Sequence, residues 1–271
     1  MRVFKQICII ALVFAVASCS MFKSKRNIDT MPVAQLYQTA HQELKFGRYA
    51  EAEKDYQRLI ARFPSGDYNQ QAQVELAYAQ YKDEKPEDAY STINRFIKTY
   101  PAHKHIDYAY YLRGLINFNR TGSFISEMLH QDLSRRDQGY RLQSFDDFAQ
   151  LTRRFPGSKY AADARQRMIY LRNGLAQFEI NVAKFYLKRK MYVASAHRAQ
   201  YVIEHYQRSP ETGDALAILA RSYKSLGLDK LSTQVVTVLK LNYPSHPYLK
   251  DPDWPSFTPL WKRMVPFANF H

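Results

Sequence analysis

Four segments of the chain end in the same way, with an aromatic residue followed by proline. The endings are ARFP at 61–64, KTYP at 98–101, RRFP at 153–156 and LNYP at 241–244. Between them apolar residues follow helical spacing, as at Leu36, Ala40 and Leu44, without the sustained alternation typical of strands. A chain that returns so often to one helix-ending signal is constrained to build repeated helical units.

The repeat that fits is the tetratricopeptide repeat, a pair of helices in about 34 residues. Small residues stand where paired helices would touch, at Ala40 and Ala52 in the first pair and at Ala77 and Ala89 in the second. The final pair, which closes at Pro244, follows the pattern most completely. We therefore predict an all-α fold, an α-solenoid of about five tetratricopeptide-like helix pairs.

The spacing also predicts the order of segments along the chain. An insertion at about 119–138 separates the helices of the third repeat and is either a packed cap or a partner loop. The tail has five prolines and many aromatic residues, so we expect an extended segment laid on the solenoid or on a partner. The expected divisions are a signal peptide (1–18), a lipidated N-terminus and linker (19–31), repeats one to three (32–156), a connecting helix near 160–177 with repeats four and five (157–244), and the tail (245–271).

The N-terminus has the layout of a bacterial secretory signal. Arg2 and Lys5 precede an apolar run from Ile7 to Ala17, which is too short for a confident membrane span. The following VASC at 16–19 resembles the lipobox of bacterial lipoproteins, in which the cysteine is acylated after cleavage. We therefore expect Cys19 to carry the lipid anchor; the alternative is a plain signal peptide with an incidental cysteine.

The chain is strongly basic, with a formal net charge of +14 that falls to +12 when residues 1–18 are removed. Such a balance favours anionic partners, such as lipid headgroups, nucleic acid or acidic proteins. Lys23, Lys25 and Arg26 follow the lipid site directly, where they either meet anionic headgroups or form a solvated linker.

Several motifs together resemble the BamD family, the lipoproteins of the outer-membrane β-barrel assembly machine. They are the lipobox, five repeats, and an enlarged third repeat in which YLRGL is followed by SRRDQ and RFPGSKYAADARQRM. The resemblance covers about residues 10–244 and leaves the tail outside. It implies a lipid-anchored adaptor on the periplasmic face of the outer membrane. Its implied partners are the periplasmic domains of the barrel-assembly subunit, other assembly lipoproteins and unfolded outer-membrane proteins.

The first helices of the N-terminal repeats predict a peptide-binding groove. Aromatic rings with nearby lysines suit an extended peptide that carries aromatic side chains and a terminal carboxylate. The alternative is that an aromatic stripe at helical spacing is simply core. The expected groove residues are Tyr37, His41, Lys45, Tyr78, Tyr81, Lys82, Tyr108 and Tyr111.

Arg198, in ASAHRAQYVI of the fourth repeat, matches an arginine that the family uses near its contact with the barrel-assembly subunit. Arginine suits bidentate pairing with a partner carboxylate, whereas a solvated helix charge is the alternative.

The sequence disfavours an enzymatic function, because it has no G-x-S-x-G, H-E-x-x-H or phosphate-binding glycine motif. His103, His105 and Asp107 lack an obvious fourth ligand, and Asp146 and Asp147 point to different sides of one helix. We therefore predict no enzyme, no metal and no cofactor beyond the lipid at Cys19, with nucleic acid disfavoured. The alternative function is another envelope lipoprotein that scaffolds peptidoglycan-associated or DNA-uptake machinery.

Overall fold

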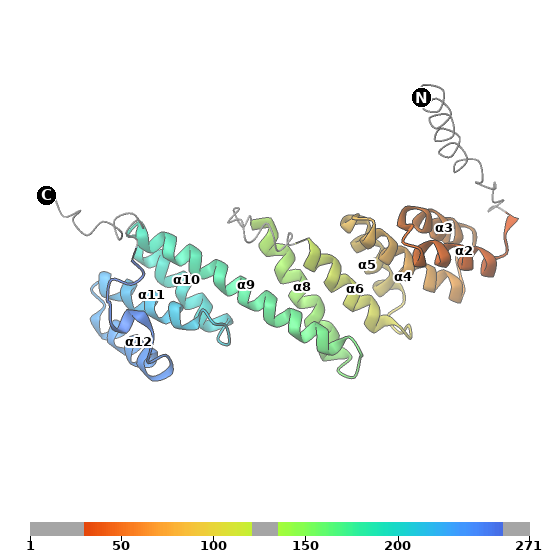
Figure 1. Cartoon of the computed structure of the whole chain (residues 1–271). Coiled ribbons are helices and arrows are strands. Elements are labelled where there is room, and N and C mark those ends of the chain that lie inside the picture. The colour runs from red at the N-terminus through yellow and green to blue at the C-terminus, as the bar shows by residue number, and fades with distance from the viewer. Residues whose placement is uncertain (1–29, 121–134, 257–271) are drawn as a thin grey trace, which may run out of the picture. The chain divides into compact units, whose positions relative to one another are not determined.

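The computed structural model describes residues 30–120 and 135–256, and within them every regular element is helical. This confirms the predicted all-α fold. The elements are α2 (Val33–Lys45), α3 (Tyr49–Arg62), α4 (Asp67–Lys82), α5 (Pro86–Thr99), α6 (Ile106–Asn119), α8 (Arg135–Arg154), α9 (Ala161–Lys188), α10 (Tyr192–His205), α11 (Thr212–Ser225), α12 (Asp229–Asn242) and the short 3₁₀ turn η2 (Pro247–Leu249) (Figure 1).

The chain divides into two compact units, here called unit 1 and unit 2. Unit 1 extends to Asp83 and holds α2, α3 and α4, whereas unit 2 begins at Glu84 and holds α5 to α12 with η2. The division falls inside the second expected repeat, between its two helices.

Unit 1 is built around the small residues predicted from the repeat pattern. Ala40 on α2 and Ala52 on α3 are fully buried, which allows close contact between the two helices. Tyr56 and Leu59 fill the core beside them. Gly47 takes a positive φ of 73° in the turn between α2 and α3, a conformation that favours glycine.

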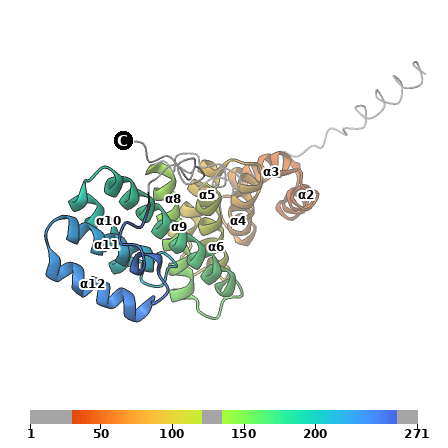
Figure 2. The ribbon, with the colours of Figure 1, turned by 60° about the vertical axis from the view of Figure 1, so that its left-hand side comes forward.

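Unit 2 repeats this arrangement along the chain, with α6 packed on α8, α9 on α10 and α11 on α12. Ala183 on α9 and Ala199 on α10 are fully buried in one cluster with Ile180 and Ile218. Figure 2 shows the helices from α8 to α12 stacked in chain order.

The helix α9 differs from the sequence prediction. A separate helical segment was expected near 160–177 before the first helix of repeat four, but one helix of 28 residues spans both. No proline interrupts the sequence at the expected junction, and the helix runs on through Asn173 and Gly174. Helix α9 therefore packs on α8, α10 and α11, and belongs to two successive repeats.

Several predicted features lie outside the described residues. These are Cys19 with the signal peptide and linker, most of the insertion (residues 121–134), and the last part of the tail (257–271). Within the described ranges, none of the helices combines the length and apolar character needed to cross a bilayer.

Candidate functional site

One face of unit 1 carries most of the predicted groove residues. Side chains spaced by one turn follow α2, and a second such row follows α4, so both rows lie along their helices. We call this surface the Glu75 face; it consists of Tyr37, His41 and Lys45 on α2 and of Gln71, Glu75, Tyr78 and Lys82 on α4.

The centre of the Glu75 face is a carboxylate held by four donors. The Tyr37 hydroxyl donates to Glu75 Oε1 at 2.7 Å, and the Gln71 amide donates to the same oxygen at 2.9 Å. His41 Nδ1 lies 2.9 Å from Oε2, which also accepts the Tyr56 hydroxyl. The Glu75 side chain is only 13% exposed, so these donors replace its water.

These contacts set the protonation of the cluster. Burial alone would raise the pKa of the Glu75 carboxyl, but its hydrogen bonds, that from Tyr56 first, outweigh burial and hold the pKa below its ordinary value. Burial, together with the negative charge of Glu75, raises the pKa of the Tyr37 and Tyr56 hydroxyls. At neutral pH the cluster is therefore an ionised carboxylate that accepts from protonated tyrosine hydroxyls.

Aromatic rings lie along the Glu75 face, and lysines lie at one of its ends. Tyr78 and Tyr81 lie with ring centroids 6.4 Å apart, and Tyr37 lies 5.3 Å from Tyr68. Lys82 Nζ is 5.9 Å from the centroid of the Tyr49 ring, which itself lies beside the turn that follows Lys45. Lys45 and Lys82 are exposed final residues of α2 and α4, so both cations mark the same end.

The other two predicted groove residues belong to unit 2 and gather with rings that the sequence did not single out. Tyr111 on α6 stacks on Tyr160 at 4.7 Å, and Tyr108 lies 5.3 Å from Tyr160. The Tyr111 hydroxyl donates to Asp163 at 2.7 Å, and Arg167 donates to the same carboxylate oxygen at 2.6 Å. The predicted set is thus two clusters, one in each unit.

The Asp163 carboxylate, like that of Glu75, is kept ionised by its hydrogen-bond donors. Burial acts to raise the pKa of its carboxyl, but the hydrogen bonds from Arg167 and Tyr111 outweigh burial and lower it. Burial and the hydrogen bond to Asp163 raise the pKa of the Tyr111 hydroxyl.

Arg198 lies at the edge of a surface pocket. Its Nη1 is 3.0 Å from Glu179 Oε2, yet 40% of its side chain is exposed. The pocket has a volume of about 690 Å³ and is lined by Tyr186, Lys190, Met191, Tyr192, Val193, Ala194, His197, Arg198 and Leu226.

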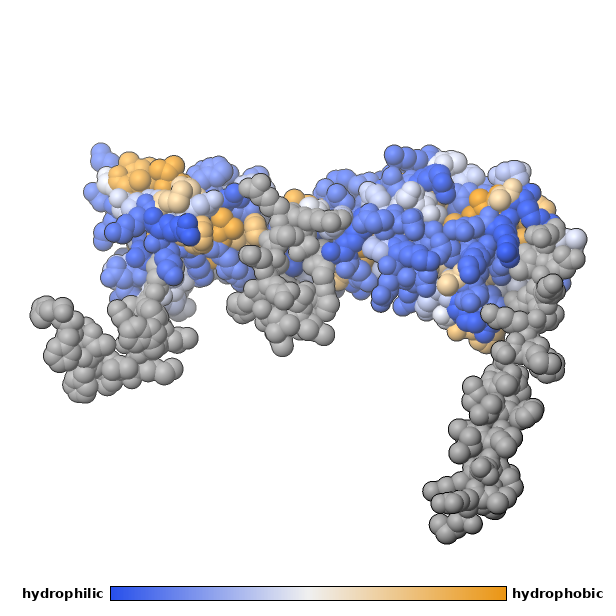
Figure 3. All heavy atoms as spheres, turned by 90° about the horizontal axis from the view of Figure 1, so that it is seen from above, coloured by the Kyte–Doolittle hydropathy of each residue, from blue (hydrophilic) through white to orange (hydrophobic). Residues whose placement is uncertain are grey.

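Apolar side chains open to solvent surround this pocket. Val193 is 70% exposed, and Phe185, Met191 and Leu226 are also exposed. Figure 3 shows apolar surface at the end of unit 2 where α9 meets α10. A group of exposed apolar side chains beside a cation is the surface expected of a protein-binding site.

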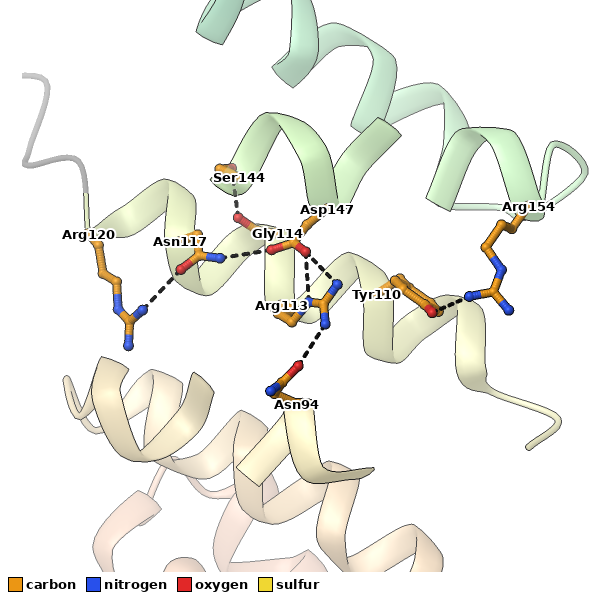
Figure 4. Close-up of polar contacts among 9 residues, drawn as sticks. All are labelled: Asn94, Tyr110, Arg113, Gly114, Asn117, Arg120, Ser144, Asp147 and Arg154. Atoms are coloured by element: carbon orange, nitrogen blue, oxygen red, sulfur yellow. Dashed lines mark hydrogen bonds and ion pairs between the residues drawn. The ribbon is translucent and has the colours of Figure 1, made fainter. Parts of the chain in front are cut away.

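A buried polar network, drawn in Figure 4, lies between α5, α6 and α8 of unit 2. Arg113 donates to Asp147 at 2.7 Å and to Asn94 at 2.8 Å, and Asn117 donates to Asp147 at 2.8 Å. Burial raises the pKa of the Asp147 carboxyl, and Arg113 only partly offsets this. The neighbouring Asp146 is exposed, so the two carboxylates face different sides of α8.

Glu75, Tyr160, Asp163 and Arg167 were missed by sequence reasoning. Glu75 follows an apolar position and precedes two more in VELA, so a charge inside a buried stretch was a usable signal. The contacts of Tyr160 depend on the α8–α9 connection and have no comparable local signal. Among the described residues no group of three or more His, Cys, Asp or Glu side chains could hold a metal ion.

Comparison with known proteins identifies relatives across nearly the whole chain. The family model of the YfiO outer membrane lipoproteins matches residues 29–239. A relative in Xylella fastidiosa, named outer membrane protein assembly factor BamD, is 44% identical over 96% of this chain and 89% of its own length. A BamD of Neisseria meningitidis serogroup B is 39% identical over 93% of this chain and 96% of its own length.

Two further matches are more distant. A BamD of Pasteurella multocida is 30% identical over 89% of this chain and 92% of its own length. Among solved structures, a tetratricopeptide repeat protein of Thermus thermophilus matches with a TM-score of 0.40 and 15% identity, over 81% of this chain and 95% of that protein. The family match and the identities to named relatives show that the chain belongs to the BamD family of outer membrane lipoproteins.

Proposed function

We propose that this chain is an outer membrane protein assembly factor that acts by binding and not by catalysis. Its relatives carry that function in their names, and they align over most of both chains. The acylated cysteine is Cys19, which anchors the protein at the periplasmic face of the outer membrane. Its partners are unfolded outer-membrane proteins, the periplasmic domains of the barrel-assembly subunit and other assembly lipoproteins.

The observation that carries the binding role is the polarity of the Glu75 face. A fixed negative charge lies at its centre, and two exposed lysines lie at one end. A ligand carboxylate is repelled from Glu75 and attracted by Lys45 and Lys82. An extended peptide therefore binds with its C-terminal carboxylate at the lysine end and its aromatic side chains over Tyr78 and Tyr37.

This assignment revises the role of two predicted groove residues. Tyr37 and His41 already hold the Glu75 carboxylate, so they are not the groups that receive a ligand carboxylate. They present their rings instead, with centroids 5.8 Å apart and nearly parallel planes, as an apolar floor for a peptide side chain.

The test is a peptide pair that differs only at the C-terminus. Ten-residue peptides ending in phenylalanine, one with a free acid and one with an amide, are titrated by fluorescence anisotropy. Replacing Lys45 and Lys82 together by Gln should weaken binding of the acid about fivefold and leave the amide unchanged. Lys54→Gln, an exposed lysine of α3, is the matched control.

Tyr78→Ala should weaken both peptides without loss of helicity. Equal loss for acid and amide in the double lysine variant would reject the carboxylate assignment. No binding of either peptide to the parent chain would reject the Glu75 face as a peptide site.

Unit 2 supplies the second proposed contact. Arg198 with the exposed apolar side chains around its pocket binds the barrel-assembly subunit, and the guanidinium exchanges Glu179 for a partner carboxylate. Gentle detergent extraction of membranes, followed by mass identification, should recover that subunit with the parent chain. Arg198→Ala should reduce its recovery and Arg208→Ala, a control outside the pocket, should not. Recovery of peptidoglycan or DNA-uptake proteins alone would overturn the assignment.

A further inference from the structure

The segment after α12 folds back onto unit 2. Figure 2 shows this segment, in the darkest blue, running from α12 back across α11. Tyr248 in η2 is buried against Leu216, Ala217 and Ala220 of α11. As far as Ser256 the tail therefore lies on the chain's own helices.

Asp214 at the start of α11 is the polar anchor of this segment. Lys184 of α9 lies 2.7 Å from its Oδ2, and His246 Nε2 lies 3.1 Å from its Oδ1. His246 Nδ1 accepts the backbone N–H of Tyr248 at 3.2 Å, so Nε2 carries the proton and donates to Asp214. One helix carboxylate thus joins α9, α11 and the tail.

Trp254 is the apolar anchor. Its ring packs on the buried cluster shared by α9, α10 and α11, and also on the cluster shared by α11 and α12. The His246 ring meets it edge-on at 4.7 Å, and Lys184 Nζ is 5.3 Å from its centroid. A large ring held between two helices and a cation is the way a bound peptide anchors in a groove.

Arg221 of α11 holds the main chain beside this ring. Its Nη1 donates to the carbonyl oxygen of Asp253 at 2.6 Å and to that of Pro255 at 3.3 Å. The Asp253 side chain is 94% exposed and 4.0 Å from the guanidinium, so the carbonyl contacts dominate. Carbonyl contacts do not depend on side-chain identity, so a peptide of another sequence with the same backbone course would satisfy them.

These contacts come from a few anchors and not from a continuous hydrophobic face. The four residues between Leu249 and Trp254 are all exposed. A segment held this way opens at a lower free energy than the helices under it.

We propose that the surface between α9 and α11 is a peptide-binding groove, which the chain's own residues 246–256 occupy. In their absence the groove takes a peptide that follows the same turned course and places an aromatic side chain at the position of Trp254. Its recognition groups are Asp214 for a donor, Lys184 for the ring and Arg221 for main-chain carbonyls. The tail competes at an effective concentration of about millimolar, so a free peptide enters only when the tail detaches.

The test uses the full chain and a labelled peptide with the sequence of residues 245–256, SHPYLKDPDWPS. Trp254→Ala in the chain weakens its own tail, so we expect this variant to bind the peptide at least about tenfold more tightly than the parent chain does. Lys250→Ala, an exposed change in the same segment, is the matched control and should bind like the parent. A peptide with alanine for its tryptophan should lose binding, as should the chain with Asp214→Asn added to Trp254→Ala.

A folded Trp254→Ala variant that binds the peptide no better than the parent would overturn the proposal. Hydrogen exchange on the parent chain gives a second test that needs no variant. Amides of residues 248–254 should exchange at least about tenfold faster than those in the middle of α11. Equal protection would mean that the segment is a fixed part of the unit 2 core and that no groove opens.

Discussion

Two buried carboxylates, one in each unit, are stabilised in opposite ways. Glu75 in unit 1 accepts hydrogen bonds from two tyrosine hydroxyls and the Gln71 amide and contacts His41, and its pKa is lowered. Asp147 in unit 2 faces the Arg113 guanidinium at 2.6 Å, and yet its pKa is raised. At Glu75 the hydrogen bonds together outweigh the effect of burial, whereas at Asp147 burial outweighs Arg113 and the Asn117 hydrogen bond. The first carboxylate lies in the proposed peptide site, whereas the second lies inside the helix packing of unit 2.

The largest expected effect follows from removing the buried acid of unit 2. Asp147→Ala leaves the Arg113 charge buried without its carboxylate and should lower the free energy of unfolding by about 3–5 kcal/mol in urea titrations. Asp146→Ala, on the exposed side of the same helix, should change it by less than about 0.5 kcal/mol. Similar values for the two variants would mean that the ion pair is not the element that closes this site.

Removing the acid of unit 1 should cost less. Glu75→Ala deprives the Tyr37 and Tyr56 hydroxyls of their acceptor, but water can reach part of this face, so we expect a loss of about 1–3 kcal/mol. Chemical denaturation measures it, with Gln38→Ala on the exposed side of α2 as control. A loss larger than that of Asp147→Ala would reverse the comparison between the two sites.

The close packing around Asp147 gives a third test. A Cβ atom added at Gly114 would lie 2.6 Å from the Phe148 ring, so Gly114→Ala should destabilise the protein by about 1–3 kcal/mol. Gly139 on α8 has nothing within 4 Å of the same added atom, and Gly139→Ala should be neutral or stabilising by up to about 1 kcal/mol. Thermal melts compare the two; equal behaviour would show that α6 and α8 can separate at little cost.

The smallest effect is a difference in the pH dependence of stability. Glu75 has a folded pKa below its unfolded value, so its stabilisation is complete above the unfolded pKa of about 4.3 and is lost as pH falls through the folded pKa. Asp147 has a folded pKa above its unfolded value of about 3.9. Its contribution to the free energy of unfolding is therefore complete below the unfolded pKa and is lost as pH rises through the folded pKa.

Unfolding free energies between pH 3 and 6 measure these slopes. Glu75→Gln should reduce the loss of stability toward acid, and Asp147→Asn should increase it. Changes of the same sign in the two variants would contradict the opposite pKa shifts.

Much of the fold was predictable because its signals are local. Alanine at helix contacts, glycine at a positive φ and proline at repeat ends each act within a few residues. Only part of the candidate site was predictable from the sequence. Helical spacing placed Tyr37 and His41 on one face, but their acceptor lies 38 and 34 residues away, beyond any periodic signal. The grouping of all eight groove residues likewise could not anticipate a division of the chain at Asp83.

The continuous α9 fixes a rotational phase inside unit 2. Its 28 residues form one unbroken helix. The angle about the helix axis between the directions of Asp163, near its beginning, and Lys184, near its end, is therefore set by residue count alone, at about 100° per residue. A flexible connection could absorb an inserted residue. In α9 one inserted residue would turn every later contact, including those with Glu179 and Asp214, about 100° away from its partner, whereas four would restore the phase to within about 40°. Helix length is therefore as strict a constraint here as any side chain.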